Sequence, residues 1–169
     1  MKLASEAAIT AAAEKFLTRA LLFRFPNVVG VPATHGMILD FIRRLHKEPD
    51  RLDVLGDGTQ KKSYLHVSDL VDAMLLIQER ATRKVDAFNI GPTDDGVFVR
   101  QIAEETVATV APGAQIHYGT GNKGWVGDVP RFTYSTAKVR ALGWRPKIDS
   151  LEVVRRAIGE IAVQERCGS

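Results

Sequence analysis

The side chains that could carry chemistry are few and widely spaced along the chain. The four histidines lack the spacing of a metal site, and the G-x-S-x-G motif of serine hydrolases does not occur. The single cysteine, Cys167, excludes an intramolecular disulfide and a cysteine zinc cluster, and it is typical of a reducing compartment, so we expect a cytoplasmic location. The polar loop 119–130 contains four glycines, and long loops of this kind are often functional.

Length and composition indicate an ordinary globular domain. The chain has 169 residues, 45% hydrophobic and 25% charged, without an apolar run of the ~18 residues that a membrane-spanning helix needs. Glu6 lies where the apolar core of a signal peptide would be, so we expect neither secretion nor a membrane partner. The net charge of +3 comes from basic pairs separated by acidic residues, which is typical of a solvated surface rather than of a nucleic-acid binding face.

Helical and strand patterns alternate along the chain. Apolar residues at helical spacing and Gly or Pro stops predict helices, while short apolar runs between turns predict strands. Ser68 and Ser150 are the expected N-caps, Trp144 is an expected core residue, and Arg24 an expected buried, paired arginine. The alternation predicts an α/β fold with buried strands of the parallel kind. The predicted helices are 3–19, 37–47, 68–80, 99–110, 136–142 and 150–166, and the predicted strands are 20–25, 52–55, 63–67, 87–90 and 115–118.

Five separated sequence blocks carry a family resemblance. The chain resembles the C-terminal half of extended short-chain dehydrogenase/reductase proteins, in particular the NAD-dependent nucleotide-sugar epimerases and dehydratases of the UDP-glucose 4-epimerase type. The resemblance implies a partial Rossmann-type fold with a late helix and strand, followed by a small α/β substrate-binding domain. Residues 1–33 would be the remnant of the NAD-binding domain, and residues 34–166 mainly the domain that binds the nucleotide sugar. The blocks are KLASEA (2–7), FRFPNVVG (23–30), GDGTQKKSYLHVSDL (56–70), FNIG (88–91) and GDVPRFTYSTAKVRALGWRP (127–146).

In this resemblance Lys2 corresponds to the lysine of the family's catalytic Tyr-x-x-x-Lys dyad, which lowers the pKa of the tyrosine and holds the ribose of NAD. The tyrosine would lie four positions earlier, upstream of Met1, and the glycine-rich turn that cradles the dinucleotide pyrophosphate is not found. Lys2 is therefore either the dyad lysine by position, without its partner, or a terminal lysine with no role. NAD is implied as the family's cofactor, and we do not expect this chain alone to bind it.

The resemblance also implies residues that hold the substrate. Asn27 corresponds to an asparagine that contacts the diphosphate of the nucleotide sugar, and the alternative is a turn after a proline. Lys62 corresponds to an arginine that clamps the diphosphate. Lysine keeps the charge but loses the bidentate fork, so Lys61 as a stand-in and a solvated strand edge stay open. Residues 34–38 correspond to the segment that opens a helix and packs on the base.

Two further candidates lie in the loop 119–130. Asp128 corresponds to an aspartate that accepts hydrogen bonds from the ribose hydroxyls of the nucleotide. Trp125 takes the place of an arginine near the phosphates. An indole cannot neutralise a phosphate but can stack on a base, and the alternative is packing under the loop. Together with Asn27 and Lys62 they complete the predicted substrate-binding residues, and no metal ligand is predicted.

The sequence therefore predicts the C-terminal, substrate-binding part of an NAD-dependent nucleotide-sugar epimerase or dehydratase. It would be inactive alone, because the glycine-rich turn and the catalytic tyrosine are lacking. The expected partners are a nucleoside diphosphate sugar and either the missing N-terminal half or a second copy, since relatives dimerise through the helix at 3–19. The alternative is a non-catalytic module for nucleotide-sugar binding or dimerisation. A nucleic-acid binder is a third hypothesis, which the charge pattern disfavours.

Overall fold

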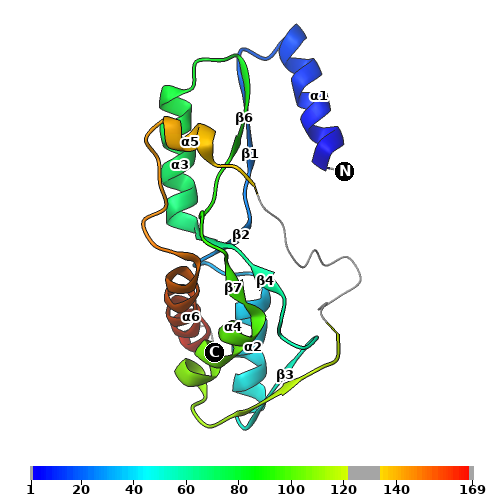
Figure 1. Ribbon diagram of the computed structural model, residues 1–169, viewed down its shortest axis with the longest axis vertical. Helices are drawn as coiled ribbons and strands as arrows, with labels where there is room; N and C mark the ends of the chain where they lie inside the picture. The colour runs from blue at the N-terminus through cyan, green and yellow to red at the C-terminus, as the bar shows by residue number, and fades with distance from the viewer. Residues whose placement is uncertain (1, 122–133, 168–169) are drawn as a thin grey trace.

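The computed structural model describes residues 2–121 and 134–167 (Figure 1). Within these ranges three of the four strand pairs are parallel, which confirms the predicted α/β class. No helix among the described residues is long and apolar enough to cross a membrane. The helices are α1 (Lys2–Lys15), α2 (Met37–Lys47), α3 (Val67–Arg80), α4 (Val99–Val110), α5 (Ala137–Ala141) and α6 (Ser150–Cys167). The strands are β1 (Ala20–Arg24), β2 (Asn27–Val29), β3 (Arg51–Val54), β4 (Lys61–Lys62), β5 (Tyr64–His66), β6 (Val85–Asn89), β7 (Val97–Phe98) and β8 (Gln115–Tyr118).

The molecule is elongated, and its elements gather at two ends (Figure 1). At one end β1 and β6 form a parallel pair, with α3 and α5 on one side and α1 on the other. At the other end α2, α4 and α6 pack against one another near the parallel pair β3–β8. The parallel pair β2–β5 and the antiparallel pair β4–β7 lie between the two ends. Short strands in the middle of the molecule thus connect its two ends.

Each end has its own hydrophobic core. The first core, at the β1–β6 end, includes Phe88, Ile90 and Trp144, so the prediction that Trp144 is a core residue is confirmed. The second core joins the inner faces of α2, α4 and α6, with Ile42 and Ile158 completely buried. These helices bury one face because their apolar residues recur every three or four positions.

The two predicted N-caps are wrong. The N-cap of α3 is His66, whose ring Nδ1 accepts the backbone N–H of Ser68 at 3.2 Å. At α6 the carboxylate of Asp149 accepts the backbone N–H three residues further on at 2.9 Å, which is the geometry of an N-cap. Ser150 is instead the first residue of α6, with 1% of its surface exposed. In both cases the residue type favours Ser as the cap, but the side chain of the residue just before it or two positions before it accepts the N–H.

The helix α1 ends at Lys15, four residues before the predicted end at 19. An ion pair between Glu6 and Arg24 links it to β1, with Arg24 Nε 2.8 Å from Glu6 Oε1. The predicted pairing of Arg24 is therefore confirmed, but its predicted burial is wrong, because 53% of its side chain is exposed. Helix α1 lies at the margin of the first core, with Ala13 as its one buried residue.

Candidate functional site

A cavity of about 850 Å³ lies between β2, the loop 30–36 and the start of α2. It opens beyond the carboxyl end of β2, which is where open α/β sheets bind their ligands. Lys62, Tyr64 and the end of β3 also line it. Its volume is within the range of small-molecule sites, roughly 300–1,000 Å³. This cavity is the candidate site.

The structure brings two of the predicted substrate-binding residues, Asn27 and Lys62, to this cavity. The side-chain amide of Asn27 donates a hydrogen bond to the carbonyl of Ser63 at 3.2 Å. Lys62 is the last residue of β4, and it pairs in register with Val97 of β7. An amide and an ammonium on one cavity are both donors, so the pair suits an anionic ligand.

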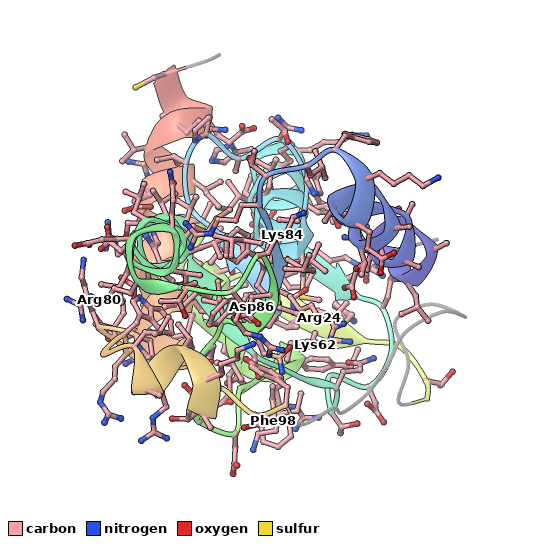
Figure 2. All side chains as sticks on the ribbon, turned by 90° about the horizontal axis from the view of Figure 1, so that it is seen from above. Arg24, Lys62, Arg80, Lys84, Asp86 and Phe98 are labelled. Carbon is pink, nitrogen blue, oxygen red and sulfur yellow. The ribbon has the colours of Figure 1, made fainter. Side chains whose placement is uncertain are left out.

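The neighbouring Lys61 does not line the cavity. Its Nζ lies 3.5 Å from a carboxylate oxygen of Asp95 and 5.0 Å from the centre of the Phe98 ring. Successive side chains of a strand point to opposite faces, which separates the two lysines. Figure 2 labels Lys62 and Phe98, which belong to the paired strands β4 and β7. Lys62, rather than Lys61, is therefore the lysine of the site.

The start of α2 forms the facing part of the cavity. Gly36 occupies the N-cap position with φ 114°, a conformation that favours glycine, and no side-chain hydrogen bond caps the helix there. The first N–H groups of an uncapped helix can bind an anion. Arg44, about two turns further along, also lines the cavity and is held by Asp40 at 3.0 Å and by the carbonyl of Asp53 at 3.2 Å. The i,i+4 spacing of Asp40 and Arg44 is typical of an ion pair on a helix, but it does not indicate that Arg44 lines the cavity.

Tyr134, a residue that the sequence analysis did not single out, packs beside the Asn27 segment. Its hydroxyl donates to the carbonyl of Pro92 at 3.2 Å, and the Ser63 side chain also hydrogen-bonds the phenol. A Cβ added to Gly91 would lie 2.1 Å from this hydroxyl and 3.0 Å from Pro26, so only glycine fits there. Burial, with a smaller contribution from Asp94, raises the pKa of Tyr134 to about 12, although the Ser63 hydrogen bond acts in the opposite direction.

This pKa predicts a loss of stability at alkaline pH. Because the pKa of Tyr134 is about 12 in the folded chain and near 10 in the unfolded chain, the contribution is complete below pH 10 and is lost between pH 10 and 12. Urea unfolding at pH 9, 10 and 11 should therefore give falling free energies of unfolding. Tyr134→Phe should be less stable at pH 9 but should fall less steeply, and an unchanged pH slope in that variant would contradict the assignment.

The structure describes only one of the other three predicted site residues. Lys2 is exposed at the start of α1 and is not among the residues that line it. Trp125 and Asp128 lie outside the described residues. A second, smaller groove of about 490 Å³ separates α1 from the β1–β6 pair, and Leu3, Glu6 and Leu22 are among its lining residues. The roles predicted for Lys2, Trp125 and Asp128 thus stay predictions.

His66 forms contacts that hold the fold together. It is buried, its Nδ1 lies 2.7 Å from Ser68 Oγ, and its Nε2 lies 3.0 Å from a carboxylate oxygen of Glu160 on α6. Burial opposes ionisation of Glu160, but hydrogen bonds with His66 and Arg156 hold its pKa below the usual value. In the described ranges no three His, Cys, Asp or Glu side chains come close enough together to hold a metal ion.

Among known protein families, the model described as "NAD dependent epimerase/dehydratase family" matches residues 1–91 of this chain. A human dTDP-D-glucose 4,6-dehydratase is 24% identical over 164 residues, which are 93% of this chain and 45% of that protein. A UDP-glucose 4-epimerase of Lactobacillus helveticus is 35% identical over 101 residues, 58% of this chain and 29% of that protein. The chain spans about half the length of the dehydratase, and less of the epimerase.

Solved structures agree over nearly the whole chain. A crystal structure of a UDP-galactose 4-epimerase superposes with a TM-score of 0.82 at 34% identity, covering 96% of this chain and 52% of that one. A protein solved with UDP-glucuronic acid and NAD superposes with a TM-score of 0.79 at 25% identity, covering 99% of this chain and 55% of that one. The match is thus to about half of each of these Rossmann-type structures.

Proposed function

Because the chain belongs to the NAD dependent epimerase/dehydratase family, we propose that it is the C-terminal, substrate-binding part of a nucleotide-sugar epimerase or dehydratase. The observation that carries the proposal is the cavity with Asn27 and Lys62 at one wall and the uncapped start of α2 at another. These are donors from three separate elements, and a diphosphate offers acceptors on several sides. The proposed ligand is a nucleoside diphosphate sugar.

The proposed division of the chain places residues 1–33 with the NAD-binding domain and residues 34–166 mainly with the substrate domain. Two observations support it. Among the described residues β1 pairs with a strand, β6, along one edge only, as expected if more strands of a Rossmann sheet belong beside it. The substrate cavity begins at β2, where the chain leaves the first core and enters the second. The exceptions are α3, β6 and α5, which pack back onto β1 (Figure 1).

For the cofactor, the residues present fit only in part. A glycine-rich turn between a strand and a helix, which would hold the pyrophosphate of NAD, does not occur in the 169 residues. Lys2 keeps its proposed role as the dyad lysine by position, and Asp128 and Trp125 keep theirs toward the ribose and the base. We derive no redox step through NAD from this chain, and we propose that it has no turnover alone. A cytoplasmic location also stays a proposal.

A second candidate is a non-catalytic module that binds nucleotide sugars or mediates dimerisation. The observation that favours it is the exposed apolar side chains at α1: Leu3 on the helix is 78% exposed, and Phe16, the residue that follows the helix, is 74% exposed. A partner that packs along this segment would bury both of them. Analytical ultracentrifugation of the chain and of a Leu3→Ser, Phe16→Ser variant tests the dimerisation role, because that role requires self-association of the parent chain and its loss in the variant.

The test of the proposed function is ligand binding by the chain itself. In calorimetric titrations we expect UDP-glucose to bind, and a short oligonucleotide to show no binding that falls steeply with salt. We expect no epimerase turnover when NAD is supplied without a further chain. Failure of UDP-glucose, GDP-mannose and dTDP-glucose to bind would contradict the binding role, and measurable turnover by the isolated chain would contradict the proposed lack of activity.

A further inference from the structure

The loop 30–36 forms one wall of the cavity, yet it has little support of its own. Most of its residues are exposed, and it follows the three-residue strand β2. In the described part of the chain, the Ala33 backbone groups are the only ones between residues 31 and 35 that form a hydrogen bond. Because exposed loop backbone orders at a considerable entropic cost, the position of this wall depends on that hydrogen-bonded contact, together with the packing of Ala33 against the second core.

The contact comes from the other end of the chain. Gln164 Oε1 accepts the backbone N–H of Ala33 at 2.7 Å, and Gln164 Nε2 donates to the Ala33 carbonyl at 2.9 Å. One side-chain amide therefore satisfies both backbone groups of a residue 131 positions away. An amide is the only uncharged side-chain group with a donor and an acceptor placed to do this.

The neighbours of Gln164 on α6 support the same wall. Ile161, three residues earlier, lines the cavity directly. Glu160 holds His66, and a Cβ on Gly30 would lie 3.1 Å from the His66 ring, so this contact sits directly behind the loop. Glu165 binds Arg43 of α2, with Arg43 Nε 2.6 Å from Glu165 Oε2. The last turns of α6 therefore back both the loop and the helix that begins after it.

We infer that Gln164 is a positioning residue for ligand binding: its amide fixes Ala33 and thereby the loop wall of the cavity. The inference rests on the proposed function, since it concerns affinity for the same nucleotide ligand. Gln164 does not touch the space that the ligand would fill, so its effect on affinity must pass through the loop.

The test uses Gln164→Glu in the full chain. This variant has the same shape and keeps the acceptor for the Ala33 N–H, but it places a carboxylate oxygen against the Ala33 carbonyl. Gln78→Glu makes the same charge change at an exposed position of α3 and is the matched control. With UDP as the probe, we expect Gln164→Glu to raise the dissociation constant about three- to tenfold. We expect the control to match the parent chain.

Hydrogen exchange measured by mass spectrometry on peptides that cover residues 31–36 gives the second readout, without ligand. We expect faster exchange in Gln164→Glu and a urea unfolding midpoint close to that of the control, which a general loss of stability would not give. Unchanged exchange in this loop would overturn the inference, as would faster exchange with an unchanged dissociation constant. If the parent chain itself fails to bind UDP, the proposed function fails, and the exchange experiment alone decides whether Gln164 orders the loop.

Discussion

Lys62→Glu is expected to raise the dissociation constant for UDP-glucose about a hundredfold, and Lys62→Ala about tenfold. Lys62 lines the cavity where the proposed diphosphate would lie, and hydrogen bonds to charged groups are the strongest of the polar contacts. Lys62→Arg should bind a few-fold more tightly than the parent chain, because a guanidinium offers two parallel donors to a phosphate. Isothermal titration calorimetry at one fixed salt concentration measures all three variants.

Lys61→Ala is the matched control for this series. It removes the same group from the adjacent position, but Lys61 pairs with Asp95 and lies over Phe98 instead of lining the cavity. We expect its affinity to stay within about twofold of the parent chain, because the contacts that Lys61 loses are with Asp95 and Phe98 and not with the ligand. An equal loss of affinity in Lys61→Ala and Lys62→Ala would mean that only the net charge matters, and it would remove Lys62 from the site.

The sequence predicts most elements of the fold because their signals are local. The helices at 37–47 and 99–110 have the predicted bounds. Their apolar spacing lies within each segment, and the residues that stop them follow directly after it. The caps of α3 and α6 could not be predicted in the same way. Ser150 is a favourable cap by residue type, but its hydroxyl is drawn to Asp94 and Tyr64, which are 56 and 86 residues away. A buried partner far along the chain outweighs the local preference.

The site shows the same limit. Asn27 and Lys62 belong to two separate sequence blocks and lie 35 positions apart in the chain, and the structure brings both to one cavity. Gln164 belongs to no such block and follows the helical pattern of α6 without distinction, so nothing in the sequence connects it with Ala33. Tyr134 lies within the block 127–146, but its contacts depend on the space that Gly91 leaves open. Contacts of this kind follow from packing between elements, which a sequence pattern does not encode.

Ser150→Ala is expected to lower the free energy of unfolding by about 2–3 kcal/mol. The Ser150 hydroxyl donates to Asp94 at 2.7 Å and accepts the buried backbone N–H of Tyr64 at 3.2 Å. Alanine would leave that N–H without a partner and would weaken the connection between α6 and β5. Urea denaturation followed by circular dichroism measures the change.

Asp149→Ala, compared with Ser150→Ala, tests whether Asp149 rather than Ser150 is the N-cap of α6. Asp149 caps α6 from an exposed position, so its loss should cost about 1 kcal/mol, the usual value for an N-cap. If Ser150 were the cap, the order would be reversed, and Asp149→Ala would be nearly neutral. Ser150 anchors α6 to β5, and α6 backs the loop 30–36, so Ser150→Ala should also weaken UDP binding. Asp149 provides an exposed cap without such an anchor, so Asp149→Ala should leave UDP binding unchanged. The larger cost at Ser150 would follow from its place between α6, β5 and Asp94 rather than from its residue type.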